Sequence, residues 1–248
     1  MKKLFVLIAA ACMTCTAAFA QTVKPFKEGE RAVFLGNSIT DGGHYHSYIW
    51  LYYMTRFPDM PIRVFNGGIG GDTAYDMNKR LDGDIFAMKP SVLMVTFGMN
   101  DSGYFEYNGD KPKEFGEQKY QESIKNYQQM EKRFKDLPDT RIVMVGTSPY
   151  DKTVQLKENT PFKTKNETIK RLVEYQKESA AKNNWEFTDL NAPMTAINQQ
   201  YQQKDPTFTL CGSDRIHPDN DGHMVMAYLF LKAQGFVGKE VADMEINA

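Results

Sequence analysis

The sequence predicts an α/β protein in which one parallel sheet carries helices on both faces. Five short apolar segments, each rich in Val, Ile, Phe, Leu and Met, lie at residues 32–35, 62–65, 92–97, 142–146 and 186–190. Their length and composition are typical of strands that are buried on both faces. Because helical patterns separate them, neighbouring strands have the crossovers that parallel pairing requires.

The helical segments are recognised by apolar residues that recur on one side. They lie at 48–57, at 117–135, at 165–182 and after Pro218. In the second, Tyr120, Tyr127 and Phe134 fall on a single stripe. The last is apolar on most sides, and we expect it to be largely buried.

Composition and continuity indicate one globular domain, which we place at residues 21–248. The 248 residues are 42% hydrophobic and 25% charged, and neither a Pro/Gly/Ser-rich linker nor a repeat interrupts them. The formal net charge is −1, without a long basic stripe. We therefore expect no nucleic-acid partner and no anionic-membrane partner.

The first twenty residues have the pattern of a secretory signal peptide rather than of a membrane span. Lys2 and Lys3 precede an apolar run at 4–11, and the small residues Ala18 and Ala20 flank a cleavage site before Gln21. The sequence thus predicts export to the periplasm or the extracellular space. Lipid attachment at Cys12 is the alternative.

Removal of residues 1–20 would leave one cysteine, Cys211, and hence no internal disulfide. We interpret Cys211 as a small apolar core residue, with a nucleophilic role as the alternative.

Candidate chemistry follows the ends of the predicted strands, where ligands bind in open parallel sheets. Ser38 lies between Gly36 and the pair Gly42-Gly43 after the first strand. Four glycines in five residues follow the second strand and let the backbone approach a ligand. The phosphate-binding and dinucleotide-binding spacings are absent from this loop. Asn100 follows the third strand, and His217 lies near the C-terminus.

These residues can form the parts of a serine hydrolase. A serine hydroxyl needs a neighbouring base, and a carboxylate must orient that base. His217 and Asp214, three residues apart, supply both groups, with Asp189 as the alternative carboxylate. The backbone N–H groups of Ser38 and Gly71, with the Asn100 amide, can meet the negative charge of a tetrahedral intermediate.

In order and spacing, these blocks resemble the SGNH/GDSL hydrolase family from about residue 31 to about residue 235. The matching segments are Gly36-Asn37-Ser38, Gly71, Gly98-Met99-Asn100-Asp101 and Asp214-Arg215-Ile216-His217. The resemblance implies a flavodoxin-like three-layer α/β/α fold and a serine esterase that needs no metal or other cofactor. It also implies that Ser38 is the nucleophile, His217 the base and Asp214 its orienting carboxylate, with Ser38, Gly71 and Asn100 as oxyanion donors. Asn37 departs from the family's more usual aspartate, which predicts altered local hydrogen bonding.

Other residues near these blocks are candidates for substrate binding. His44 and His46 form a His-x-His pair whose alternatives are a zinc site, the lining of a substrate pocket or an exposed surface. Tyr104 and Tyr107, with Phe105, can form an aromatic platform for a sugar ring, or can pack a loop against the body.

Export, a mildly acidic composition and aromatic–polar loops favour a water-soluble ester. The sequence therefore predicts a secreted or periplasmic esterase that removes small acyl groups, O-acetyl above all, from carbohydrates. One alternative is a lysophospholipase or acyl-thioesterase of the same family, which needs a long apolar groove. The other is a catalytically inactive glycan-binding protein.

Overall fold

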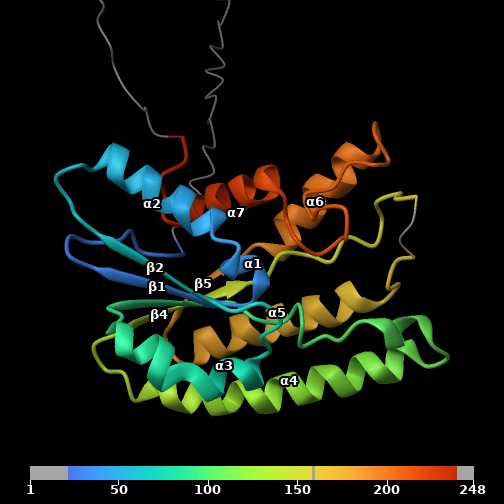
Figure 1. Ribbon diagram of the computed structural model, residues 1–248, viewed down its shortest axis with the longest axis horizontal. Coiled ribbons are helices and arrows are strands. Elements are labelled where there is room, and N and C mark those ends of the chain that lie inside the picture. Colours follow the sequence, from blue (N-terminus) through green and yellow to red (C-terminus); the bar gives the residue numbers. More distant parts are fainter. Residues whose placement is uncertain (1–21, 158–159, 239–248) are drawn as a thin grey trace, which may run out of the picture.

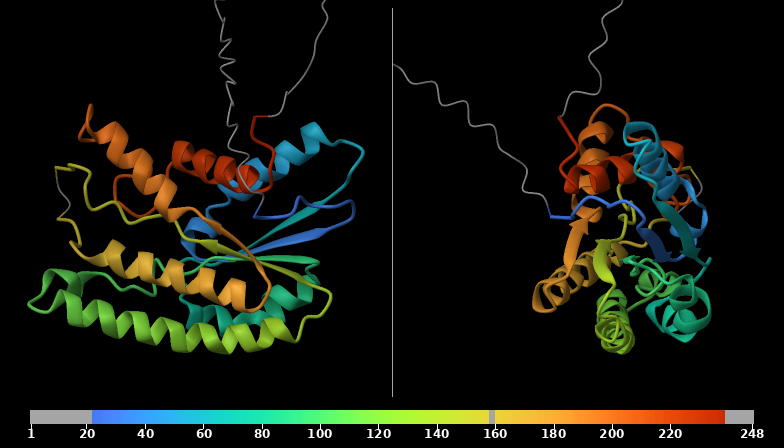
Figure 2. Two further views of the ribbon diagram at one scale, coloured as in Figure 1. Left: turned by 180° about the vertical axis from the view of Figure 1, so that it is seen from behind. Right: turned by 90° about the vertical axis from the view of Figure 1, so that its left-hand side faces the viewer.

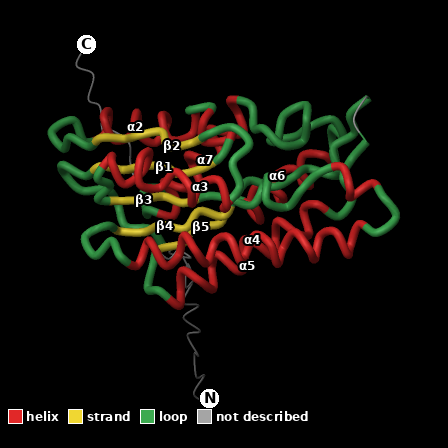
Figure 3. Tube along the Cα trace, turned by 60° about the horizontal axis from the view of Figure 1, so that its bottom comes forward, coloured by secondary structure: helices red, strands yellow, loops and turns green. Residues whose placement is uncertain are grey.

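Five parallel strands form a sheet through the middle of the molecule (Figure 1). The computed structural model describes residues 22–157 and 160–238. The strands are β1 (Arg31–Gly36), β2 (Arg63–Gly68), β3 (Val92–Val95), β4 (Arg141–Gly146) and β5 (Glu186–Asp189). Their order is β2-β1-β3-β4-β5, and each neighbouring pair is parallel (Figure 3). The predicted α/β class and the five-stranded parallel sheet are confirmed.

Helices cover both faces of the sheet and give three layers (Figure 2). On one face lie α2 (His44–Arg56), α6 (Asn191–Gln202) and α7 (Asn220–Ala233). On the other lie α3 (Ala74–Arg80), α4 (Pro112–Lys135) and α5 (Lys165–Lys182). A single turn, α1 (Ser38–Asp41), follows β1 directly.

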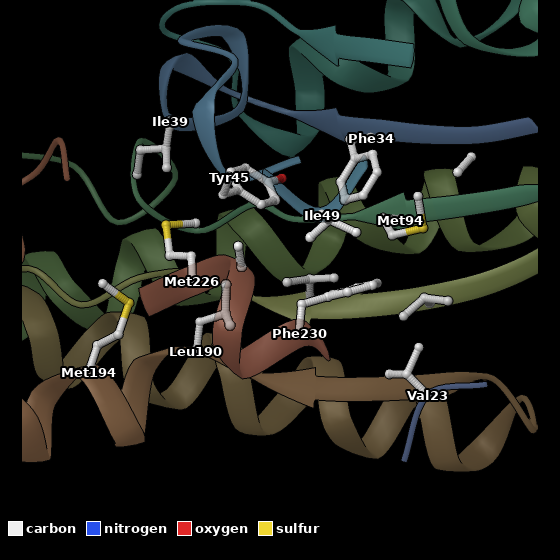
Figure 4. Packing of buried hydrophobic residues seen from close by; sticks show 14 of the residues in the cluster. Val23, Phe34, Ile39, Tyr45, Ile49, Met94, Leu190, Met194, Met226 and Phe230 are labelled. Carbon is white, nitrogen blue, oxygen red and sulfur yellow. The ribbon is translucent and has the colours of Figure 1, made fainter. Parts of the chain in front are cut away.

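The central strands are buried on both faces, so each contributes to two hydrophobic cores. Along β1, Phe34 points to the core under α2 and α7, whereas Val33 and Leu35 point to the core over α3 and α4. Phe34 contacts Tyr45 of α2 and Phe230 of α7, with ring centroids 5.6 and 6.0 Å apart (Figure 4). This alternation explains why the strands appear in the sequence as unbroken apolar runs.

The helices differ from the sequence expectation in four places. α2 begins at His44 and α4 at Pro112, earlier than the expected 48 and 117, and α6 was not expected at all. The prediction that the last helix is largely buried is wrong. Met224 and Tyr228 of α7 are 52% and 49% exposed, because only one side of the helix packs on the sheet.

The strand order reverses between β1 and β3, which positions the site. The chain leaves β1 toward α2 on one face and leaves β3 toward α4 on the opposite face. Such a reversal opens a crevice outside the carboxyl ends of the two strands. Ser38 follows one of these ends and Asn100 the other.

Within residues 22–157 and 160–238, no helix is long and apolar enough to cross a membrane. The predicted signal peptide at 1–20, with Cys12, lies outside the described residues.

Candidate active site

Ser38 is the first residue of α1 and is held there by local packing. The Asn37 side chain caps the turn, accepting the Ile39 N–H at Oδ1 at 3.1 Å. Gly36 allows the turn to close on β1, since a Cβ at this position would lie 2.0 Å from Thr40 Oγ1. Asn37 is thus a buried capping residue and not a part of the reacting set.

The structure brings Ser38, His217 and Asp214 into one hydrogen-bonded series. Ser38 Oγ lies 2.8 Å from His217 Nε2, and His217 Nδ1 lies 2.5 Å from Asp214 Oδ2. Asp214 Oδ1 accepts the backbone N–H groups of Ile216 and His217, each at 2.9 Å. These bonds fix the carboxylate, and the carboxylate in turn directs His217 Nε2 toward Ser38.

The negative charge of Asp214 makes His217 a stronger base. The hydrogen bond to Asp214 raises the pKa of His217 above its usual 6.5, although partial burial opposes this. Burial raises the pKa of Asp214, but the hydrogen bonds from His217 and from the backbone outweigh it and keep that pKa below its usual 3.8. Asp214 therefore stays ionised wherever His217 titrates.

Arg215 anchors the loop that carries the pair, a role the sequence did not reveal. Its side chain is fully buried, and its Nη1 donates to the carbonyls of Asp151 and Val154 at 3.2 and 2.6 Å. Its backbone has φ +71°, a left-handed conformation that is costly for a residue with a Cβ. The loop between Asp214 and His217 is thus held in a strained but fixed shape.

Gly71 and Asn100 lie after β2 and β3, on either side of the β1 end in the strand order. Gly71 has φ +86°, a conformation that favours glycine, and in the described chain its N–H meets no acceptor. Asn100 Nδ2 donates to the Asp72 carbonyl at 2.9 Å with one of its two N–H groups. The second N–H is not used by this contact.

Buried and partly buried charges join the three strand ends behind the site. Arg80 Nε donates to Asp72 Oδ2 at 2.6 Å, and its Nη2 donates to the carbonyls of Gly36 and Gly67. Asp101 is buried and accepts the N–H groups of Ala74 and Gly98, each at 2.9 Å. Nothing in the sequence separates Arg80 from the solvated arginines, because only burial in the fold distinguishes it.

Two predicted substrate-binding residues are unavailable to a substrate. His46 is 5% exposed, with Nε2 3.2 Å from the Thr40 carbonyl oxygen, and burial lowers its pKa. Tyr107 is 2% exposed, and its hydroxyl donates to the Ser102 carbonyl at 2.7 Å and lies 2.9 Å from the Thr168 hydroxyl. His46 joins the buried stripe of α2 with Ile49; continuing the helical periodicity backward would have revealed this.

The other two candidates lie at the surface or beside the site. His44 is exposed at the start of α2, its ring stacked 5.1 Å from the His223 ring, so it does not share a metal with the buried His46. Among the residues that the structure describes, no group of three His, Cys, Asp or Glu side chains is arranged to hold a metal ion. Tyr104 is partly buried, and its hydroxyl donates to Asn100 Oδ1.

The two alternative reactive groups have structural contacts instead. Asp189 Oδ1 accepts the N–H groups of Asn191 and Ala192 at the start of α6, so Asp214 is the carboxylate that His217 meets. Cys211 is fully buried, and its Sγ donates to the Pro149 carbonyl at 3.2 Å. Burial raises the pKa of Cys211 to about 12, which leaves it an unreactive thiol.

One polar cavity adjoins the site, and another begins at the residue that follows His217 in the chain. One of about 340 Å³ has Asn100 in its wall, together with Thr73, Tyr75 and Lys119. A second, of about 420 Å³, begins at Pro218, next to His217; its lining is His44, Pro218, Asp219, Asn220, Asp221 and His223.

The apolar cavity lies elsewhere. It has about 700 Å³, runs between α2 and α7 past Leu51, Tyr52 and Tyr228, and is lined by none of Ser38, Gly71, Asn100, Asp214 or His217.

The fold and the Ser–His–Asp series define a serine ester hydrolase. The family model of GDSL-like lipases and acylhydrolases matches residues 34–225. The chain belongs to this GDSL-like lipase/acylhydrolase family, also called SGNH hydrolases.

Individual relatives differ in how much of their length the chain spans. An acetylxylan esterase of Geobacillus stearothermophilus is 27% identical over 224 residues, 84% of this chain and 95% of that protein. A solved variant of the acetyl-xylooligosaccharide esterase of that species superimposes with a TM-score of 0.67 at 24% identity, over 89% of this chain and 99% of that one, and shows the same fold. A structure described as a gut microbial diltiazem-metabolizing enzyme is 84% identical with a TM-score of 0.90. It covers 91% of this chain, but this chain spans only about half (51%) of its length.

Proposed function

We propose that this chain is an exported esterase that removes O-acetyl groups from carbohydrates, with Ser38 as nucleophile. Membership of the family makes the chain an ester hydrolase. The observation that carries the proposal is the continuous series from Ser38 Oγ through His217 to Asp214, at 2.8 and 2.5 Å.

The proposed reaction has two stages. His217 Nε2 takes the Ser38 proton as Oγ bonds to the ester carbonyl carbon, and the oxyanion is met by the N–H groups of Ser38 and Gly71 and by the Asn100 amide. The bond to the alcohol then breaks, and His217 returns the proton to the leaving oxygen. In the second stage His217 deprotonates a water, which bonds to the carbonyl carbon of the acyl-Ser38 ester. The bond from that carbon to Ser38 Oγ then breaks, His217 returns the proton to Oγ, and the acid leaves.

The surroundings of His217 support a polyhydroxylated alcohol. Because His217 protonates the leaving oxygen, the alcohol lies on the His217 side of the scissile bond. The cavity that begins at Pro218, the next residue along the chain, offers the carboxylates of Asp219 and Asp221 and the amide of Asn220, groups that hydrogen-bond hydroxyls. Phe105, 81% exposed beside Tyr104, adds a ring face on which a sugar can stack. The acetylxylan esterase relative is consistent with this substrate class.

A second candidate substrate class is an acetate ester of a bulky alcohol that bears aromatic rings. It is favoured by the 84% identity to the diltiazem-metabolizing enzyme, since diltiazem itself carries an acetate ester. The same catalytic series would cleave both esters, and the two classes differ only in the alcohol.

Acetate release with a Ser38→Ala control tests the proposal. The protein from Gln21 onward is incubated with acetylated xylo-oligosaccharides and, separately, with diltiazem, and acetate is quantified. We expect release from the oligosaccharides to fall by about 10⁴-fold or more in Ser38→Ala, with an unchanged melting temperature. Release from diltiazem alone would favour the second candidate, and wild-type turnover in folded Ser38→Ala would exclude the mechanism.

Export is tested separately. When the full chain is expressed in a Gram-negative host, we expect the mature protein in the periplasmic or secreted fraction, with Gln21 at its N-terminus. A cytoplasmic protein that retains residues 1–20 would contradict this, and lipid attached at Cys12 would support the membrane-anchored alternative.

A further inference from the structure

Lys165 is a buried ammonium group next to the loop that carries Asn100. It is the first residue of α5 and is fully buried. Its Nζ donates to the Met99 carbonyl at 2.6 Å, to Ser102 Oγ at 2.7 Å and to the Gly103 carbonyl at 2.5 Å. Three acceptors around one nitrogen match the three donors of a charged lysine.

These three contacts hold the backbone on both sides of Asn100. Met99 immediately precedes Asn100, whereas Ser102 and Gly103 follow it. The Ser102 hydroxyl also donates to the Met99 carbonyl at 2.9 Å, which closes the turn on itself. Lys165 therefore fixes where the Asn100 backbone lies relative to β3.

The same ammonium also acts on the Asn100 side chain, through Tyr104. Lys165 Nζ lies 3.8 Å from the centroid of the Tyr104 ring, within the range of a cation–π contact. The Tyr104 hydroxyl donates to Asn100 Oδ1. With Oδ1 held by Tyr104 and Nδ2 bonded to Asp72, the amide has one fixed orientation.

We propose that Lys165 is a positioning residue for ester hydrolysis, which acts through Tyr104 and the turn after β3 to hold the Asn100 amide where the oxyanion forms. This inference rests on the proposed function. Burial lowers the pKa of Lys165, which Asp101 nearby opposes, so keeping the lysine charged costs stability. The three hydrogen bonds of Nζ and its contact with the Tyr104 ring offset that cost, and all of them lie beside Asn100.

A double-mutant cycle against Asn100 tests the inference. Lys165→Met retains the length of the side chain and removes the donors. In otherwise wild-type protein, we expect it to lower kcat for nitrophenyl acetate by about 10–100-fold at a nearly constant KM, the effect of misplacing a group that acts in the transition state. In the Asn100→Ala background, which itself loses about 10²–10³-fold in kcat, Lys165→Met should change kcat by less than about twofold.

Two further variants keep the test decisive if Lys165→Met does not fold. Tyr104→Phe retains the ring over Lys165 and removes only the hydroxyl, and its effect should also vanish in the Asn100→Ala background. Tyr127→Phe is the matched control. It keeps the ring that stacks on Phe97 and removes only a buried hydroxyl that bonds Ser179 on α5 at 2.8 Å, so it should lower stability without changing kcat.

The outcomes distinguish a failure of the role proposed for Lys165 from a failure of the proposed esterase function. Equal losses in kcat with and without Asn100 would show a merely structural role for Lys165 and overturn the inference. Unchanged kcat in both folded variants would overturn it as well. Wild-type protein that hydrolyses no ester would refute the proposed function itself, independently of Lys165.

Discussion

The protonation of one exposed residue, His217, controls how the proposed site responds to pH. The ring must be neutral to accept the Ser38 proton, and Asp214 raises its pKa above 6.5. We therefore predict that kcat/KM rises with pH through a midpoint above about 6.5 and is lost as pH falls below it. Asp214→Asn should move that midpoint downward and lower the maximal rate by about 10⁴-fold, as in other serine triads.

An NMR titration of the ring protons of His217 checks the same pKa without turnover. His223 is an internal reference, because burial and the neighbouring histidines lower its pKa to about 4 and it should remain neutral across the activity range. A wild-type midpoint below pH 6.5, or one that Asp214→Asn leaves in place, would refute the assignment of Asp214 as the partner of His217.

At the residue scale, the sequence was sufficient to predict the catalytic residues, because these can be recognised by their order along the chain. Ser38, Asp214 and His217 were predicted from strand ends, from spacing and from the resemblance to the hydrolase family, and the structure brings them into contact. Lys165 was given no role, and for Tyr107 the sequence left open a sugar platform or the packing of a loop, of which the structure shows the second. Only the packing of α5 and α4 on the loop after β3 decides that the lysine and the tyrosine are buried.

At the scale of elements, α1 and the end of β2 are packed backbone to backbone. A Cβ on Gly68 would lie 2.2 Å from the Asp41 nitrogen and 2.7 Å from the Thr40 carbonyl carbon. We predict that Gly68→Ala displaces α1, and Ser38 with it. Unfolding free energy should fall by about 1–3 kcal/mol, and kcat/KM by about tenfold or more.

Gly70→Ala is the matched control for this displacement. A Cβ there meets only Asp41 Oδ2, at 3.7 Å, so denaturant midpoint and kcat/KM should stay close to wild type. If both alanine variants behave alike, the close approach at Gly68 does not position Ser38.

The helices and strands that the sequence predicted best are those whose buried side chains are apolar. All five strands were found, and α5 has the predicted bounds, because Ile169, Leu172 and Val173 form its inward stripe. α6 was missed because its buried side consists of Asn191, Met194 and Asn198, which leaves no hydrophobic period to detect.

At the scale of the whole molecule, polar and apolar cavities are segregated. One polar cavity has Asn100 in its wall and another begins at Pro218, next to His217 in the chain, whereas an apolar cavity follows α2 and α7 along the outer layer. The sequence did not predict this apolar cavity, because α7 was expected to be buried on most sides. Its position matters for function, since an acyl groove of a lipid-directed hydrolase must open at the nucleophile.

Acyl-chain preference follows from that layout and distinguishes the acetyl esterase from its lipid-directed alternative. With nitrophenyl esters from acetyl to octanoyl, we predict the highest kcat/KM for acetyl and a steep fall by octanoyl, because Ser38 does not line the apolar cavity between α2 and α7. The variant Leu51→Gln tests whether the apolar cavity binds the acyl chain. Leu51 is 57% exposed in the apolar cavity, so the variant should fold and leave the whole series unchanged. Rates that climb toward octanoyl, and that Leu51→Gln lowers for octanoyl alone, would instead make the α2–α7 cavity an acyl groove and the enzyme a lipid hydrolase.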